Sequence, residues 1–309
     1  MRPPLPTAVG GRPTVRVVLP SGPIGASHQG AFDAGLGALE RAGCAVRFDP
    51  ARRDSTWRGY LAGGDAERAD ELVRALGEPG VDIVWCGRGG SGASRIARQV
   101  VEAAATARPR IFVGFSDATA LLSPLATRLG WVTFHGPAVT SLGRPAQIQV
   151  DLDADLALLR GESSAILYSA SAPGPSLEGR LMGGNLTVLA SLLGTPSSPA
   201  GSVTDPLWLL EDVNEPAYRL DRCFQQLRAA GLLTGARGVW LGDLGVGREE
   251  SCAIADAFAA DASPLPVVMG APAGHRGRLA LLPMGARVRL EPTEGRLLLL
   301  EPCVACPRG

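Results

Sequence analysis

The sequence lacks a net charge, a long apolar run and an abundance of charged side chains. Its 309 residues carry 30 basic and 30 acidic groups, and charged residues make up only 19% of the chain. No overall field attracts nucleic acid or an anionic membrane, so a small neutral or zwitterionic ligand is the expected partner. No apolar run approaches the roughly 18 residues of a membrane span, and the stretch MRPPLPTAVGGRPT lacks the apolar core of a signal peptide. We therefore expect a cytoplasmic protein without nucleic-acid or membrane partners.

The cysteines are too scattered to indicate a disulfide scaffold. A chain of this length buries enough apolar surface to fold without cross-links, so reduced thiols are expected. Cys303 and Cys306 form a lone CxxC pair with no second pair and no nearby histidine. This pattern falls short of a zinc site, and we expect neither a metal nor a cofactor.

The first half of the chain alternates short apolar runs with segments of helical spacing. Strands are expected at 15–19, 45–48, 81–85 and near 111, and helices at 31–42, 65–76 and 96–105. Such alternation predicts βα units and a parallel sheet covered on both faces. Sheets of this kind bind ligands beyond the carboxyl ends of their strands, where the loops at 86–92 and 114–117 lie.

The second half repeats this alternation after a Ser-, Pro- and Gly-rich segment at 165–179, which we interpret as a linker. Helices are expected at 186–193 and 218–230, and strands at 207–210, 238–241, 266–269, 287–290 and 297–300. The predicted fold class is α/β, with an amino-terminal parallel-sheet domain (residues 1–164) and a smaller carboxy-terminal α/β domain (residues 180–309).

The stretch VGFSDATALL places Ser116 between an apolar run and the start of a helix. A serine in this position is most often a helix cap, because its side chain accepts from free amide groups of the first turn. Gly114 favours another interpretation, since a glycine two residues before a serine permits the tight turn of a nucleophile elbow. Ala118 stands where that motif has its last glycine. The local sequence leaves both roles open.

A serine nucleophile needs a neighbouring base, most often histidine, and a carboxylate that orients the base. The histidines are His28, His135 and His275. His275 is the best-placed base, because the glycines of GAPAGHRGR relax the backbone and allow the ring to reach another domain. A single histidine in a loop is also a common surface residue.

Glu211 ends the apolar run at 207–210, which directs its carboxylate to the ligand-binding edge of the sheet. Asp212 and Glu215 are its rivals for the role of orienting carboxylate. The alternative role of this acidic cluster is helix capping, with Asp212 or Asn214 as the cap. The spacing alone does not decide between them.

The loop GRGGSG at 87–92 follows a predicted strand. Its backbone amides suit a phosphate or a developing oxyanion. It lacks the Lys-Ser/Thr ending of a P-loop and does not match G-x-G-x-x-G, so a nucleotide site is weakly supported. Arg88 is either a structural ion-pair partner or an anchor for a substrate carboxylate.

Taken together, these segments resemble the LD-carboxypeptidase family, the S66 serine peptidases, over nearly the whole chain. Each motif is weak alone, but their joint order is specific. The motifs are VVLPSGP at 17–23, YLAGGD at 60–65, VDIVWCGRGGSG at 81–92, GFSD at 114–117, HGP at 135–137, GGNL at 183–186, SLLGTP at 191–196, LEDVNE at 210–215, YRLDR at 218–222, GH at 274–275 and LPMGA at 282–286.

The resemblance implies a two-domain α/β enzyme whose Ser-His-Glu triad is divided between the domains. Ser116 would be the nucleophile, His275 the base and Glu211, preferred over Glu215, the orienting carboxylate. The amides that would form the oxyanion hole belong to Gly89 or Gly90 and to Asp117. The candidate substrate-binding residues are Arg88, Ser91, Arg219 and Arg276.

The resemblance also implies the reaction. Family members of the murein-recycling type remove terminal D-alanine from muropeptide tetrapeptides by cleaving an L,D bond, and relatives inactivate microcin C-type peptidyl nucleotides. Ser91 replaces the tyrosine that is common in the glycine-rich loop, which widens the pocket or changes its stacking surface. A non-catalytic module that holds a phosphate or nucleotide in this loop is a third hypothesis. Family analogy also suggests a homodimer.

Overall fold

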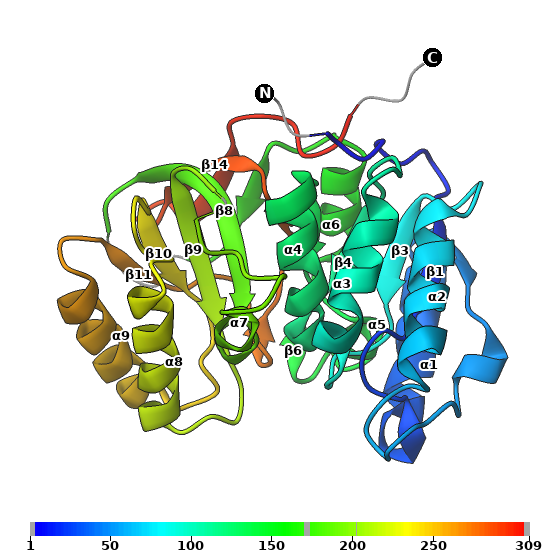
Figure 1. Cartoon of the computed structure of the whole chain (residues 1–309). Helices are drawn as coiled ribbons and strands as arrows, with labels where there is room; N and C mark the ends of the chain where they lie inside the picture. The colour runs from blue at the N-terminus through cyan, green and yellow to red at the C-terminus, as the bar shows by residue number, and fades with distance from the viewer. Residues whose placement is uncertain (1–3, 170–173, 202, 306–309) are drawn as a thin grey trace.

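Two α/β units lie side by side (Figure 1), and near the two ends of the described chain Thr7 pairs with Ala305. The structure is a computed structural model that describes residues 4–169, 174–201 and 203–305. Each unit contains a sheet with parallel strands and helices against it, which confirms the predicted fold class.

The first unit is built on a six-stranded sheet in the order β13-β5-β4-β3-β1-β2. The strands from the first half of the chain run parallel, and β13 pairs antiparallel with β5. The bounds are β1 Thr14–Val18, β2 Ala45–Arg47, β3 Ile83–Cys86, β4 Ile111–Gly114, β5 Thr133–His135 and β13 Leu282–Met284. The carboxyl ends of β3, β4 and β5 therefore share one edge, where the predicted loops emerge.

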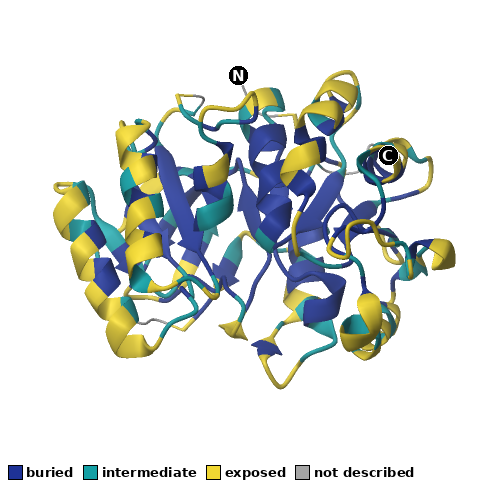
Figure 2. Ribbon diagram, turned by 60° about the horizontal axis from the view of Figure 1, so that its bottom comes forward, coloured by how far each residue is buried: buried dark blue, intermediate teal, exposed yellow. Residues whose placement is uncertain are grey.

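Helices cover both faces of this sheet. Successive strand residues point to opposite faces: Val84 and Phe112 pack with α2, α3 and α4, whereas Ile83 and Ile111 pack with α1, α5 and α6. Burial on both faces, visible as dark strands in Figure 2, explains why the strands are continuous apolar runs. The helices are α1 Gly25–Arg41, α2 Asp65–Gly77, α3 Ala93–Ala104, α4 Thr119–Leu129, α5 Val139–Leu142 and α6 Leu152–Leu159, with short 3₁₀ turns η1 Pro50–Arg52 and η2 Ser116–Ala118.

The second unit contains a seven-stranded sheet in the order β11-β10-β9-β8-β14-β15-β7. Strands β8 to β11 are parallel, and β14, β15 and β7 are antiparallel. One face packs against α7, α8 and α9, and the other contributes to the apolar cluster that includes the first sheet. The bounds are β7 Ala165–Leu167, β8 Leu177–Asn185, β9 Pro206–Glu211, β10 Gly238–Leu241, β11 Val267–Met269, β14 Arg287–Glu291, β15 Arg296–Leu299, α7 Leu186–Leu192, α8 Ala217–Ala229 and α9 Arg248–Ala262.

The expected linker at 165–179 overlaps two strands of the second sheet. β7 pairs with β15, and β8 begins at Leu177. Residues 170–173 of this segment lie outside the described residues. Because β13 comes from the second half of the chain but pairs in the first sheet, the two units also exchange a strand. The domain limits at 164 and 180 stay a prediction.

Strand β8 ends where the two units meet. A Cβ atom at Gly184 would lie 2.5 Å from Oγ1 of Thr119, so a side chain there would separate the surfaces. The backbone amide of Asn185 donates to the same hydroxyl oxygen at 3.0 Å. Glycine thus lets β8 approach the first turn of α4, the helix that follows Ser116, and brings the paired strand β9 close to this turn.

Membrane insertion by a helix finds no support in this fold: across residues 4–169, 174–201 and 203–305, none of the helices combines the length and apolar character of a membrane span.

Asp155 on α6 gives the fold a pH-dependent component. Its carboxylate accepts from the backbone amide of Leu281 at 2.9 Å, and burial raises its pKa from 3.8 to about 7. Between these values the native state binds more protons than the unfolded state, so the free energy of unfolding falls as the pH rises. We expect Asp155→Asn to remove this pH dependence. Over the whole range the unfolding free energy of the wild type is expected to change by at most about 4 kcal/mol. Urea unfolding of both proteins across this pH range measures it, and equal slopes would contradict the assignment.

Candidate active site

Ser116 stands on a tight turn at the end of β4. Its φ of 59° lies in the left-handed region that disfavours side chains, a form of local strain often found at functional sites. Its side chain caps neither η2 nor α4. Gly114 makes the turn possible, because a Cβ atom there would lie 2.7 Å from the Cβ of Ala118. The backbone of this turn therefore has the positive φ expected of a nucleophile elbow.

The glycine-rich loop after β3 lies directly against this serine. A Cβ atom at Gly89 would approach the Ser116 Oγ to 3.3 Å, and one at Gly90 would lie 2.9 Å from the Cα of Gly22. The Asp117 carboxylate accepts from the backbone amide of Ala93 at 2.8 Å, which ties the elbow to the end of the same loop. Only glycines at these positions allow the loop backbone to lie so close to Ser116. Backbone amides in such a place suit a developing oxyanion.

Glu211 is the last residue of β9, and its side chain is fully buried. Neighbouring Asp212 has a different role, because its carboxylate accepts from the amide and hydroxyl of Thr187 at 2.9 and 2.8 Å and from the Asn185 side chain at 3.0 Å. Asp212 therefore fastens the start of α7, and Glu211 is left to face the histidines. Glu215 instead pairs with Arg219 at 3.3 Å.

The loop that carries His275 is fixed against the end of β10. The amide of Asp243 donates to the carbonyl oxygen of Ala273 at 2.8 Å, and a Cβ atom at Gly274 would lie 2.3 Å from the Cβ of Asp243. On the other side of the histidine, Arg276 pairs with Asp243 at 2.9 Å. Next, β12 (Gly277–Arg278) pairs with β6 (Ile148–Gln149) of the first unit. The loop is thus held by both units.

Two histidines flank the Glu211 carboxylate. Nδ1 of His275 lies 3.2 Å from Oε2, and Nε2 of His135 lies 3.7 Å from Oε1. The first distance is within hydrogen-bond range but is poorly aligned, and the second is longer than a hydrogen bond. Burial alone would raise the pKa of Glu211, but its contacts with His135 and His275 outweigh burial and lower the pKa to about 2. The carboxylate is therefore ionised at neutral pH.

Ser116 and His275 open into one cavity of about 430 Å³ between the two units. Its size is in the range of small-molecule sites. Gly89 and Gly90 of the glycine-rich loop and Phe115 also line it. Residues that lie far apart in the sequence therefore line one cavity.

Models of two protein domains match this chain. The LD-carboxypeptidase N-terminal domain matches residues 15–136, and the LD-carboxypeptidase C-terminal domain matches residues 178–290. The chain belongs to the LD-carboxypeptidase family.

A Bacillus subtilis protein named a probable murein peptide carboxypeptidase is 31% identical to this chain, with 94% of this chain and 92% of the relative covered. The crystal structure of muramoyltetrapeptide carboxypeptidase from Oxalobacter formigenes superposes with a TM-score of 0.74 at 28% identity, over 93% of this chain and 97% of that chain. The microcin C7 self-immunity protein MccF in its wild-type apo state gives 0.84 at 21% identity, over 97% and 99% of the two chains, and shows the shared fold alone. As a member of this family of peptidases, the protein is a hydrolase.

Some of the substrate-binding residues predicted from the sequence of this LD-carboxypeptidase lie outside the cavity. The lining of the cavity does not include Ser91, Arg219 or Arg276. Arg219 is exposed beside Glu215, and Arg276 holds the His275 loop through its ion pair with Asp243. Arg88 does line the cavity, and its guanidinium donates to the carbonyl oxygen of Pro23 at 2.5 Å.

Other lining residues carry no pattern in the sequence that indicates a site. Arg144, in the turn after α5, and His28, on α1, join Arg88 around one part of the cavity. Burial and the charges of Arg88 and Arg144 lower the pKa of His28, and burial with the Arg144 charge lowers the pKa of Arg88. These groups repel one another, and among the described residues no carboxylate lies within ion-pair distance of either arginine. An anionic group of a ligand is therefore favoured here.

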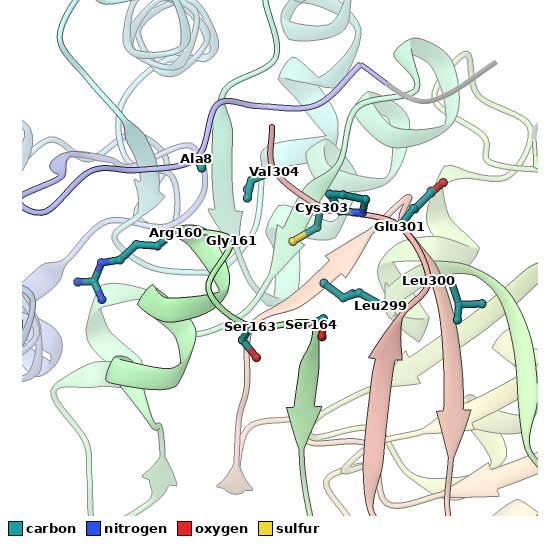
Figure 3. A pocket seen from close by; sticks show the side chains of 11 residues that line it. Ala8, Arg160, Gly161, Ser163, Ser164, Leu299, Leu300, Glu301, Cys303 and Val304 are labelled. Carbon is teal, nitrogen blue, oxygen red and sulfur yellow. The ribbon is translucent and has the colours of Figure 1, made fainter. Parts of the chain in front are cut away.

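A second cavity lies where the two ends of the chain meet, and Figure 3 shows its side chains. It measures about 290 Å³ and shares no lining residue with the first cavity. Its acidic residue, Glu301, is already paired with Arg180 at 3.0 Å, and the Arg160 guanidinium extends away from Cys303 (Figure 3). It contains no histidine to act as a base. Within the described parts of the chain, no cluster of side chains is suited to hold a metal ion; Cys306 of the CxxC pair lies outside them.

Proposed function

We propose that this hydrolase is a serine carboxypeptidase that releases terminal D-alanine from murein tetrapeptides by cleaving an L,D peptide bond. The observation that carries the proposal is the convergence of Ser116, the Glu211–His275 pair and the glycine-rich loop on one cavity. The names of the Bacillus subtilis and Oxalobacter formigenes relatives support murein peptides as the substrate class.

The reaction follows from the geometry of the histidine. Because Nδ1 of His275 faces the Glu211 carboxylate, it carries the proton, and Nε2 is left as the base. Nε2 accepts the Ser116 proton as the hydroxyl attacks the scissile carbonyl, and it then donates that proton to the leaving amine of D-alanine. A water molecule repeats the sequence and hydrolyses the acyl-enzyme.

The oxyanion of the tetrahedral intermediate needs donors that are already oriented. The amide of Asp117 follows the nucleophile directly, the backbone of Gly89 lies against the Ser116 side chain, and Gly89 and Gly90 both line the cavity. We assign the oxyanion hole to Asp117 and one of these glycines. Removal of one such donor typically costs about 10²- to 10³-fold in rate.

We further propose that Arg88 and Arg144 bind the carboxylate of the terminal D-alanine. A carboxypeptidase must recognise a free carboxylate next to the scissile bond, and the basic part of the cavity provides this charge. Loss of one charged hydrogen bond costs about 1.5–3 kcal/mol. We therefore expect Arg144→Gln to lower kcat/KM by about 10- to 100-fold, mainly through KM.

The matched control is Arg219→Gln, which removes an exposed arginine outside the cavity. Steady-state release of D-alanine from tetrapeptide is measured for both variants. If Arg219→Gln raises KM more than Arg144→Gln does, the carboxylate of the terminal D-alanine is bound outside the Arg88–Arg144 part of the cavity.

The decisive test of the function is incubation of the purified protein with murein tetrapeptide and detection of free D-alanine by mass spectrometry. A microcin C-type aminoacyl-nucleotide analogue is assayed in parallel, because the fold is shared with MccF. Cleavage of the nucleotide analogue without release of D-alanine would contradict the carboxypeptidase proposal. Binding of either ligand without turnover would favour the non-catalytic module.

We propose a cytoplasmic location and a homodimeric assembly, both supported by the family resemblance. Sedimentation of the purified protein tests the assembly, and a single species of 31.9 kDa would contradict the dimer.

A further inference from the structure

His135 at the end of β5 is a polar residue without an evident partner. Its side chain is fully buried, and neither ring nitrogen has a hydrogen-bond partner among the described residues. Leaving a buried polar group unpaired costs free energy, and such groups in folded proteins call for a specific explanation. The ionised group nearest to His135 is Glu211, with 3.7 Å between Nε2 and Oε1.

The backbone of His135 connects the segments that carry the triad. It pairs with Gly114 on β4, just before Ser116, and with Leu282 on β13, which follows the His275 loop. The amide of Gly136 also donates to the carbonyl oxygen of Gly114 at 2.9 Å. A shift of His135 therefore moves the nucleophile strand and the base loop together.

The ring of Phe115 packs against the rings of both His135 and His275. Its centroid lies 5.3 Å from that of His135, edge to face, and 4.4 Å from that of His275. Phe115 is only 3% exposed, so the Glu211–His135 contact is shielded from water. Charge–dipole contacts are stronger in such a dry environment than at the surface.

We propose that His135 is a positioning residue that holds the Glu211 carboxylate in the orientation His275 requires. His135 directs its Nε2–H to Oε1 while His275 directs its Nδ1–H to Oε2, so donors from both units hold the two carboxylate oxygens. The 3.7 Å separation shortens to a hydrogen bond in the substrate complex, as catalytic contacts commonly do. Contact with His135 is also the largest of the influences that lower the pKa of Glu211. The inference rests on the proposed hydrolase function.

Three substitutions test the proposal. His135→Gln keeps an N–H donor near the position of Nε2, His135→Asn places its donor near Nδ1, and His135→Leu has no donor. Because His135 does not line the cavity, we expect His135→Leu to lower kcat by about 10²-fold and leave KM within about twofold. We expect His135→Gln to recover most of kcat and His135→Asn to remain close to His135→Leu.

A purely structural role gives a different result. In that case kcat follows thermal stability, and the Gln and Asn variants do not differ at equal stability. Full activity of His135→Leu would also overturn the proposal.

A second readout separates this inference from the choice of substrate. The rate at which a fluorophosphonate labels Ser116 reports activation of the nucleophile without any peptide. If the wild-type protein is labelled but releases no D-alanine, the substrate proposal fails while the His135 series remains interpretable. Equal labelling rates in wild type and His135→Leu would refute the positioning role.

Discussion

Ser116→Ala is expected to lower kcat by about 10⁶-fold and to leave the fold intact, because in the proposed mechanism the hydroxyl attacks the substrate. The strained turn, the glycine-rich loop and the basic cavity all remain in this variant, so substrate binding should persist. Tetrapeptide turnover measures the first effect, and calorimetric titration of the variant with tetrapeptide measures the second. Turnover at a tenth of the wild-type rate would exclude the serine mechanism.

A matched control separates the role of the hydroxyl from the strain of the turn. Glycine adopts the φ of 59° at position 116 more easily than alanine does. Ser116→Gly should therefore unfold at a higher temperature than Ser116→Ala and be equally inactive. Residual activity that differed between the two would indicate that backbone strain, and not the hydroxyl, limits the rate.

The strands β1, β3 and β4 of the first sheet were predictable because they are buried on both faces and are therefore short continuous apolar runs, whereas nothing in the local sequence predicted that β13 joins them. The role of Ser116 was not decidable from local sequence. A cap and a nucleophile both occupy the junction of strand and helix, and what distinguishes them is the positive φ of Ser116 and the absence of a capping bond. Those are properties of the folded backbone.

Strand β8 escaped prediction for a physical reason. Gly179, Gly183 and Gly184 lower its apparent strand propensity, yet each is required by a close approach. A Cβ atom at Gly183 would lie 1.9 Å from the carbonyl oxygen of Leu209 on the paired strand, and one at Gly184 would meet Thr119 across the units. Such contacts with distant residues are invisible in a local pattern.

Local sequence also could not show which charged side chains face the cavity. Arg276 was one of the candidate substrate-binding residues, but its guanidinium pairs with Asp243. Arg144 has no motif around it and enters the site only because the turn after α5 lies beside the elbow. Sequence could identify the types of residue the chemistry needs, whereas their neighbours in space decide which of them face the ligand.

Glu211→Gln is expected to lower kcat by about 10⁴-fold, comparable to the loss of the orienting carboxylate in other serine triads. A glutamine side chain has one acceptor oxygen for two histidines, and its amide group forces the histidine it faces to accept a hydrogen bond. If that histidine is His275, its Nδ1 loses the proton, Nε2 gains it, and the base is lost. The kcat for D-alanine release checks this result.

The pH dependence of stability provides a second measurement on the same variant. The pKa of Glu211 is lowered from 4.5 to about 2, so its carboxylate stabilises the native state above pH 4.5. That contribution is lost as the pH falls toward 2. The difference in unfolding free energy between wild type and Glu211→Gln should therefore shrink in acid; a constant difference would contradict the stabilising contacts of the Glu211 carboxylate with His135 and His275.

Glu215→Gln is the matched control, because it removes the rival carboxylate of the same loop. Glu215 pairs with Arg219 on the surface and does not line the cavity, so its loss should change kcat by less than about twofold. The two variants alter the same chemical group four residues apart, and only one of them faces a histidine. If Glu215→Gln were the inactive one, the units would have to rearrange on substrate binding and bring a different carboxylate to His275.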